Sequence, residues 1–367
     1  MDGQYNNASA RWAAVGPYYA MFPTSFADDV VARFTEPGDW VLDPFAGRGT
    51  TIFSAAASDR HGIGIEVNPV GWLYGATKLA IASRKSVEAR LCAVEKAASQ
   101  STSEVDNLPE FFTWCFNEDV LTFLLAARSM LNWRTSKIDR TLMAFILVYL
   151  HGKHGAALSN QMRQTKSMAP RYAVNWWRER DLKPPALDPG DFLRHRIAWR
   201  YARGVPTLTK SHIFLGDCTR RVDGLASRWS AQRIQPIKLL LTSPPYFSLA
   251  NYHYDQWLRI WMLGGRADAN LVGGENRGKF ESREAYSKLL FTAFKRASSY
   301  LSPDAVIYVR TGSRRETYEA TTLSLAKVFP NHHVVAEDRP YLRPTQTRLF
   351  GDHEVKAGEV DLVLRAE

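Results

Sequence analysis

One segment of the 367-residue chain constrains its fold more than any other: an apolar strand that runs into a glycine loop and then into a helix. The strand Trp40–Leu42 is followed by Asp43 and by the loop Gly47–Thr51, which reads Gly-Arg-Gly-Thr-Thr. A helical stretch, Thr51–Ser58, and a second strand, Gly62–Glu66, come next. Strand, helix and strand in this order form a βαβ unit. The segment therefore predicts an α/β fold with a parallel sheet.

The glycine loop is suited to hold a ligand. In open α/β sheets, ligands bind beyond the carboxyl ends of the strands. Gly47 and Gly49 permit positive φ and a close approach of the backbone to a ligand, and the threonines that follow can cap the next helix. Glu66 ends the second strand, 23 residues after Asp43. An acid at that position suits a ribose with free hydroxyls.

The rest of the chain divides into two further parts. Residues 85–210 show helical periodicity without strands, and the apolar run Leu142–Leu150 reads as a buried core helix. Residues 211–367 return to strands, expected at 212–215, 238–241, 305–309, 333–336 and 361–364, and to helices, expected at 256–263 and 284–298. We therefore expect a Rossmann-like α/β domain, with helices on both faces of its sheet, made of 1–84 and 211–367 and interrupted by a helical insert at 85–210.

The insert holds most of the positive charge of the chain. Residues 151–210 contain twelve Lys and Arg against four Asp and Glu, a surplus of eight out of the chain's net +10. Aromatic residues, among them Trp176, Trp177 and Trp199, are interleaved with these cations. Such a segment favours a polyanionic partner, with a solvated basic face packed by aromatic rings as the alternative.

Several classes of protein are disfavoured. The three cysteines lie far apart, and His151/His154 and His332/His333 have no matching acid or cysteine cluster, so neither a disulfide framework nor a metal site is expected. The longest apolar run is about half of the ~20 residues that a membrane-spanning helix needs. The N-terminus is polar and lacks the apolar core of a signal peptide. We expect a soluble intracellular protein.

A second segment indicates what kind of reaction the protein catalyses. The apolar strand Leu239–Leu241 runs into Thr242-Ser243-Pro244-Pro245-Tyr246. Two prolines fix a stiff, non-helical corner at the end of a strand. The Pro244 carbonyl and the Ser243 hydroxyl can accept hydrogen bonds from an exocyclic amine, and Tyr246 can stack on its ring. A plain Pro-Pro turn is the alternative when this stretch is considered alone.

Together, the stretches DPFAGRGTT and TSPPY resemble the amino-group DNA methyltransferases, which form N4-methylcytosine or N6-methyladenine with S-adenosylmethionine. Residues 21–25, Met-Phe-Pro-Thr-Ser, look like the family motif that helps hold the methionine part of the cofactor, and Leu215–Asp217 looks like the acid-bearing motif before the catalytic strand. The resemblance covers about 1–84 and 211–367. The Gly-Asp motif follows the insert here, an order that fits no standard class of the family.

The resemblance implies a role for each matching residue. Glu66 would bind the ribose hydroxyls and Asp217 the adenine. The cofactor site would consist of Thr24, Ser25, Asp43, Pro44, Phe45, Gly47, Gly49, Thr50, Glu66, Asn68 and Asp217. The catalytic corner would consist of Ser243, Pro244, Pro245 and Tyr246.

The resemblance also implies the reaction, which is methyl transfer to the exocyclic amine of a base flipped out of duplex DNA. Serine before Pro-Pro resembles the cytosine-N4 enzymes more than the adenine enzymes, so we expect N4-methylcytosine, with N6-methyladenine as the alternative. An RNA amino-methyltransferase is a further alternative, and a non-catalytic DNA-binding protein of the same fold is less favoured. No Pro-Cys dipeptide, as a C5-cytosine enzyme would need, occurs in the chain.

Double-stranded DNA is the expected partner, and the insert between the two motifs is the expected target-recognition region. Candidate DNA contacts are Arg163, Lys166 and Arg171 in the insert, and Arg343, Thr345 and Arg348 near the C-terminus. At the level of the family, a cytoplasmic enzyme of a prokaryote or phage is expected, with a restriction endonuclease as a possible companion in a restriction-modification system.

Overall fold

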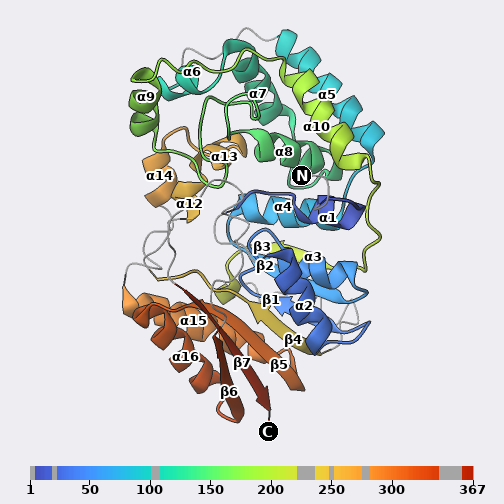
Figure 1. Cartoon of the computed structure of the whole chain (residues 1–367), viewed down its shortest axis with the longest axis vertical. Coiled ribbons are helices and arrows are strands. Elements are labelled where there is room, and N and C mark those ends of the chain that lie inside the picture. Colours follow the sequence, from blue (N-terminus) through green and yellow to red (C-terminus); the bar gives the residue numbers. More distant parts are fainter. Residues whose placement is uncertain are drawn as a thin grey trace. The chain divides into compact units, whose positions relative to one another are not determined.

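The computed structural model describes residues 5–18, 23–100, 108–220, 236–247, 252–274, 282–338 and 358–366. Two compact units are formed by segments that alternate along the chain. The helical unit comprises Met1–Tyr19, Ala80–Pro206 and Tyr252–Glu275, and the sheet unit comprises Ala20–Leu79, Thr207–Asn251 and Asn276–Glu367. Figure 1 labels the elements of both units.

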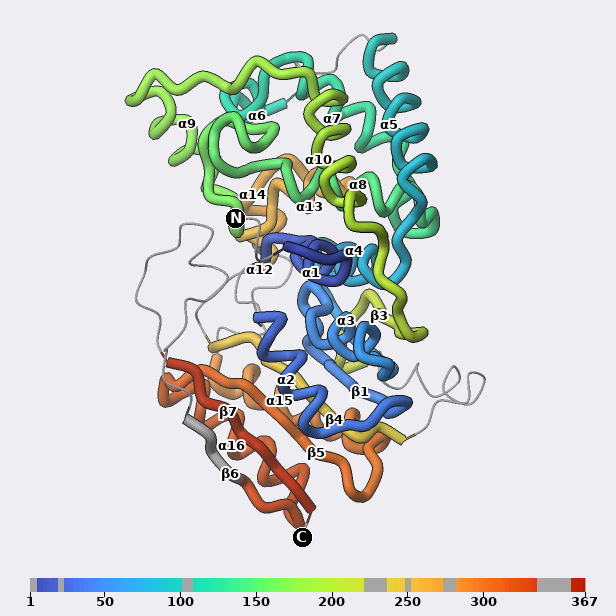
Figure 2. Tube along the Cα trace, turned by 45° about the vertical axis from the view of Figure 1, so that its right-hand side comes forward, coloured from blue at the N-terminus to red at the C-terminus, as the bar shows by residue number. Residues whose placement is uncertain are grey.

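In the sheet unit, the described strands form one seven-stranded sheet of order β3-β2-β1-β4-β5-β7-β6. The strands are β1 (Trp40–Asp43), β2 (His61–Glu66), β3 (His212–Leu215), β4 (Ile237–Thr242), β5 (Leu301–Gly312), β6 (His332–Asp338) and β7 (Glu359–Ala366). All neighbours pair in parallel except β7, which is antiparallel to both β5 and β6. Figure 2 shows β5 and β7 side by side.

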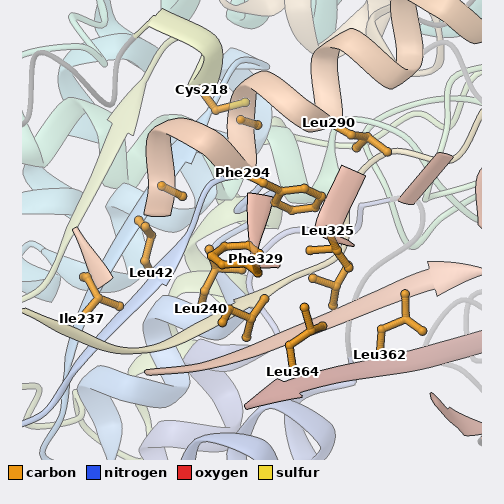
Figure 3. Packing of buried hydrophobic residues seen from close by; sticks show 14 of the residues in the cluster. Leu42, Cys218, Ile237, Leu240, Leu290, Phe294, Leu325, Phe329, Leu362 and Leu364 are labelled. Carbon is orange, nitrogen blue, oxygen red and sulfur yellow. The ribbon is translucent and has the colours of Figure 1, made fainter. Parts of the chain in front are cut away.

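Helices cover both faces of this sheet. They are α2 (Thr24–Phe34), α3 (Thr50–Ala57), α4 (Pro69–Leu79), α15 (Arg283–Ser298) and α16 (Arg315–Val328). Side chains alternate along a strand, so Leu42 and Leu240 face one cluster while Val41 and Leu239 face another. The first cluster includes Leu290 and Phe294 of α15 (Figure 3), and α2 and α3 pack on the second. The predicted Rossmann-like α/β fold is confirmed.

The helical unit contains the other described helices. They are α1 (Ala8–Ala13), α5 (Arg84–Ser99), α6 (Phe111–Cys115), α7 (Glu118–Met130), α8 (Lys137–Tyr149), α9 (Pro170–Arg178), α10 (Pro189–Tyr201), α12 (Tyr252–Asp255), α13 (Trp257–Met262) and α14 (Ala269–Gly274). The apolar run Leu142–Leu150 is buried except for the half-buried Tyr149, and all of it but Leu150 lies in α8. Capping residues mark where such helices begin. In α10, the Asp188 carboxylate accepts from the Asp191 amide, and Pro189 occupies the first turn.

The domain boundaries differ from the division 1–84, 85–210 and 211–367. Residues 1–19 and 252–275 group with the helical insert. The reason is packing: the Arg11 guanidinium lies 4.4 Å above the Trp199 ring, and the Trp12 indole donates to the Gly204 carbonyl. From α13, Trp257 packs edge-on against Phe111, and Trp261 packs at a tilt against Phe112. Since both segments are bound to the insert by buried aromatic side chains, they belong to its core.

Candidate active site

The two motifs that carry the chemistry lie at the ends of neighbouring strands. Val41 pairs with Leu239 and Leu42 with Leu240, so β1 and β4 run side by side in parallel. The strand order reverses between them, with β2 and β3 on one side and β5 on the other. Ligands of open α/β sheets bind in the crevice at such a switch point. Segments 43–49 and 243–246 therefore leave the sheet at the same edge.

A hydrogen bond joins the two motifs directly. The Thr242 hydroxyl donates to Asp43 Oδ1 at 2.6 Å. The Phe45 amide donates to the same oxygen at 3.1 Å. Burial raises the pKa of Asp43 to about 6, against the lowering effect of hydrogen bonds from Thr242, Thr51 and Phe45. The carboxyl group of Asp43 is thus fixed at the seam between β1 and β4.

The glycine loop needs its glycines for two reasons. Gly47 has φ 53° and Gly49 has φ 73°, in the left-handed region that side chains rarely adopt. A Cβ added at Gly49 would also lie 3.0 Å from the Gly75 Cα, and one at Gly71 would lie 2.8 Å from the Gly47 carbonyl oxygen. The loop and α4 are therefore packed backbone to backbone.

Glu66 supports the loop from the end of β2. Its Oε2 accepts from the Gly47 amide and its Oε1 from the Asn68 amide, both at 2.7 Å. Burial raises the pKa of Glu66 to about 8; the backbone hydrogen bonds from Asn68 and Gly47 lower it, and the nearby charge of Asp43 raises it. Each carboxyl oxygen keeps a further lone pair with which it can accept a hydrogen bond from a ligand.

The other expected cofactor residues have structural partners. Asn68 Oδ1 accepts a hydrogen bond from the Val70 amide at the start of α4. Pro44 is buried, and Phe45 packs against the hydrophobic cluster of Figure 3. Gly49 is the N-cap of α3, and no side chain caps it, so the expected threonine cap is wrong. The Thr50 hydroxyl instead accepts from Arg48 Nε at 3.2 Å.

Asp217 reaches the same edge from β3. Glu66 pairs with Leu215, and the Gly216 amide donates to the Glu66 carbonyl at 2.8 Å. Asp217 Oδ1 accepts from the amide and the hydroxyl of Thr219, at 2.9 and 2.8 Å. Three acidic residues therefore lie at the carboxyl ends of adjacent strands: Asp43 ends β1, Glu66 ends β2, and Asp217 comes shortly after β3.

The Ser-Pro-Pro-Tyr corner is half-buried, and its aromatic ring is held by polar contacts. The Tyr246 hydroxyl donates to Glu359 Oε1 at 3.0 Å, and the Ser243 hydroxyl lies 3.5 Å from the Tyr246 hydroxyl. A Cβ built on Gly312, at the end of β5, would lie 3.4 Å from the Tyr246 ring. The ring thus lies over the end of β5, with its hydroxyl bound to β7. Pro244 is buried and Pro245 is half-buried.

Glu359 and its neighbours form a polar cluster that was not expected from the sequence. Arg310 binds Asp361 with two hydrogen bonds, at 2.7 and 2.9 Å, and its Nη1 lies 3.7 Å from Glu359. The guanidinium also lies 3.5 Å from the centre of the Phe26 ring. Burial lowers the pKa of Arg310, but its hydrogen bonds to Asp361 and the nearby negative charges act in the opposite direction. The net effect is a pKa raised above the ordinary value. No motif marks these residues, because they meet only through the antiparallel register of β5 and β7.

Other expected site residues are not joined to this network. Thr24 and Ser25 begin α2, the first half-buried and the second exposed, and α2 has no side-chain cap. Met21 and Phe22 lie outside the described residues. In the helical unit, Arg163 and Arg171 are exposed and Lys166 is half-buried. Arg343, Thr345 and Arg348 also lie outside the described residues.

Two features are absent from the described residues. Among them, no helix has the length and apolar character that crossing a bilayer requires. Nor does any group of three or more His, Cys, Asp and Glu in the described part of the chain have the arrangement of a metal site.

Comparison with known proteins finds one family model and several relatives that match part of the chain. Residues 2–70 match the family model described as DNA methylase. The type II methyltransferase M.Cfr9I of Citrobacter freundii is 38% identical over 73 residues, 18% of this chain and 24% of that protein. The DNA adenine methyltransferase YhdJ of Escherichia coli K12 is 39% identical over 88 residues, 24% of this chain and 30% of that protein. The chain thus spans less than a third of the length of these relatives.

Among solved structures, the rRNA methyltransferase AviRa of Streptomyces viridochromogenes is similar at a TM-score of 0.35 with 16% identity, over 99% of this chain and 96% of that one. The segment that matches the DNA methylase family contains β1, the glycine loop and Glu66, whose geometry is described above. By this match, residues 2–70 are similar to the amino-group (N6/N4) DNA methylase family.

Proposed function

We propose that the protein is a site-specific DNA methyltransferase that moves a methyl group from S-adenosylmethionine to the exocyclic amine of a flipped base. One observation carries the proposal: the Thr242–Asp43 hydrogen bond joins the glycine loop of a DNA methylase segment to a Ser-Pro-Pro-Tyr corner. A cofactor loop and an amine-accepting corner at one sheet edge provide what direct transfer requires, namely two reactants held in line.

The residues at the ends of β1, β2 and β3 fit S-adenosylmethionine. Gly47 and Gly49 leave the loop backbone open to a ligand, and Glu66 has lone pairs left for the ribose hydroxyls. Asp217 would accept from the amino group of the adenine, and the Thr242–Asp43 hydrogen bond fixes the loop against β4. Bound there, S-adenosylmethionine would supply an electrophilic methyl group on a sulfonium centre.

The corner residues act on the target base. An exocyclic amine is a weak nucleophile because its lone pair is delocalised into the ring. The Ser243 hydroxyl and the Pro244 carbonyl would accept its two N–H groups, which localises the lone pair toward the methyl group. Tyr246 would stack on the face of the base, with its ring position set by Glu359 and Gly312. Alignment of this kind can lower a barrier by about 7–11 kcal/mol in the best cases.

Cytosine N4 is the proposed target atom, supported by serine at position 243. Adenine N6 is the competing target, and the relative YhdJ is named a DNA adenine methyltransferase. The relative M.Cfr9I is named a type II methyltransferase. By analogy, a restriction endonuclease that cuts the same DNA sequence is the proposed companion, and the cytoplasm is the proposed compartment.

The proposal is tested by transfer of a labelled methyl group. Purified protein is incubated with methyl-labelled S-adenosylmethionine and with equal amounts of duplex DNA or structured RNA. Label is expected in DNA only, and calorimetry should detect binding of S-adenosylmethionine. Label in RNA only would make the protein an RNA methyltransferase. Absence of cofactor binding would indicate a fold that has lost catalysis.

A further inference from the structure

Helix α9 exposes a polar face near its N-terminal end. Its buried side chains are Ala173, Val174 and Trp177. On the opposite side Arg171, Tyr172 and Asn175 are exposed, and Tyr172 has 60% of its surface accessible. Positions 171 and 175 are four residues apart and positions 172 and 175 are three apart, so Asn175 is a neighbour of both other side chains and the three form one surface. We call Arg171, Tyr172 and Asn175 the α9 face.

Buried contacts hold helix α9 in place. The Trp177 indole donates to the Gln161 carbonyl at 2.7 Å, and its ring lies 5.6 Å from that of Phe111. Pro170 occupies the first turn, where its fixed φ favours the helix. Side chains that discriminate between ligands need such a rigid support. The α9 face therefore has the rigidity of a recognition surface.

Most other cationic side chains near α9 form ion pairs or hydrogen bonds within the protein. Arg178 pairs with Glu110 at 2.6 Å. On α10, Arg194 pairs with Glu95 and Asp191, and Arg200 donates to the Arg11 carbonyl. For the Arg171 side chain, by contrast, no hydrogen bond or ion pair occurs within the parts of the chain that the structure describes. Its guanidinium is therefore available to an external acceptor.

The loop before α9 adds positive charge beside the face. Arg163 is exposed, and Lys166 is half-buried, with Asp255 as a charged neighbour. His151 Nδ1 donates to the Arg163 carbonyl at 2.7 Å, and Arg259 Nη2 donates to the Gln164 carbonyl at 2.6 Å. These buried contacts fix the loop backbone. The charge complements a polyanion, and phosphate contacts would orient the helix on it.

We infer that the α9 face enters the major groove of duplex DNA and reads the edges of the bases in the target sequence. This inference rests on the proposed function. An α-helix fits the major groove, and recognition helices contact bases with their N-terminal residues. Arginine binds guanine O6 and N7 through two hydrogen bonds, and asparagine binds adenine N6 and N7 in the same way. Tyr172 adds an aromatic contact beside them.

The test compares variants for both rate and sequence preference. Arg171→Ala and Asn175→Ala change exposed side chains, so both are expected to fold, which melting temperatures check. Arg84→Ala on α5 is the matched control, because Arg84 is half-exposed and pairs with Glu88 on its own helix. First, sequencing of modified bases defines the motif that the wild-type protein methylates. Then kcat/KM and the methylated motif are measured for each variant.

We expect each α9 variant to lose about 5- to 150-fold in kcat/KM at the wild-type motif and to accept other bases at one position. The Arg84→Ala control should keep both the rate and the motif. Wild-type rates and an unchanged motif in both variants would overturn the inference. A uniform loss on all sequences with an unchanged motif would also overturn it, because that result marks a phosphate contact. Failure of the proposed function would appear earlier, as absence of methylation by the wild-type protein.

Discussion

The Thr242 hydroxyl donates a 2.6 Å hydrogen bond to Asp43 Oδ1 and so joins two strand ends that are 199 residues apart in the chain. Both residues are buried. The residues that the proposed reaction uses lie at these two strand ends, at the end of β2 (Glu66) and after β3 (Asp217), and Glu359 of β7 binds the Tyr246 hydroxyl. The hydrogen bond is therefore the structural link between the glycine loop and the Ser-Pro-Pro-Tyr corner.

Replacement of Thr242 by valine should destabilise the protein. The side chain keeps its shape but leaves a buried carboxylate without its hydroxyl donor, a loss of about 1–3 kcal/mol in the free energy of unfolding. Urea denaturation at pH 8 measures it. The Thr242→Ser variant, which keeps the hydroxyl, should retain most of the stability. Equal stability of the valine and serine variants would contradict the role of this hydrogen bond.

The ligand-free protein should lose stability as pH rises toward 8 because of Glu66. Its pKa is about 8 in the folded protein against an ordinary value of 4.5, so between these values the folded state binds more protons than the unfolded state. The free energy of unfolding then falls with rising pH. The test is urea denaturation from pH 5 to pH 9 for the wild type and for Glu66→Gln. The wild type should show the steeper decline, and parallel curves would contradict the raised pKa.

Truncation of Tyr246 should weaken the target-base site without affecting the cofactor. Stacking of a base on an aromatic ring contributes about 1–3 kcal/mol, so Tyr246→Ala should lower kcat/KM for DNA by about 5- to 150-fold. Tyr246→Phe keeps the ring and should lose less. Calorimetry should give an unchanged affinity for S-adenosylmethionine. Equal losses for the alanine and phenylalanine variants would show that stacking is not what the ring provides.

Glu359 should act as a positioning residue for the Tyr246 ring. The Glu359→Gln variant keeps an acceptor for the Tyr246 hydroxyl at 3.0 Å, whereas Glu359→Ala removes it. We expect the alanine variant to raise KM for DNA several-fold and the glutamine variant to restore it, because a neutral hydrogen bond contributes about 0.5–1.5 kcal/mol. If glutamine and alanine behave alike, the carboxylate has another role.

Charge reversal of the loop before α9 should weaken DNA binding at low salt. Arg163→Glu and Lys166→Glu each remove one candidate phosphate contact, and each lost contact reduces the slope of log K against log salt by about 0.9. Fluorescence anisotropy of labelled duplex DNA at several salt concentrations measures the slope. An unchanged slope would remove the loop from the DNA footprint.

Much of the sheet could be predicted from sequence, because each parallel strand is a short apolar run with a clear end. Asp43, Glu66 and Pro244 mark the carboxyl ends of β1, β2 and β4. Helix α16 was missed. Its buried side chains include Thr317, Thr321 and Ser324, and such small polar residues do not produce the apolar periodicity on which helix prediction depends.

Long-range packing could not be predicted in the same way. The contact of Glu359 with Tyr246 depends on the antiparallel register of β7 against β5, which no local pattern encodes. Likewise, α1 and α13 join the helical unit through Trp12, Trp257 and Trp261, whose partners lie far away in the chain. The roles assigned to the cofactor and catalytic residues stay predictions until variants are measured.

The central claim is methyl transfer to an exocyclic amine of DNA, and mass spectrometry of nucleosides tests it most directly. DNA treated with the protein and S-adenosylmethionine is digested and compared with untreated DNA. We predict N4-methylcytosine in the treated sample. N6-methyladenine without N4-methylcytosine would contradict the choice of cytosine, and absence of both would contradict amino-group methylation of DNA by this protein.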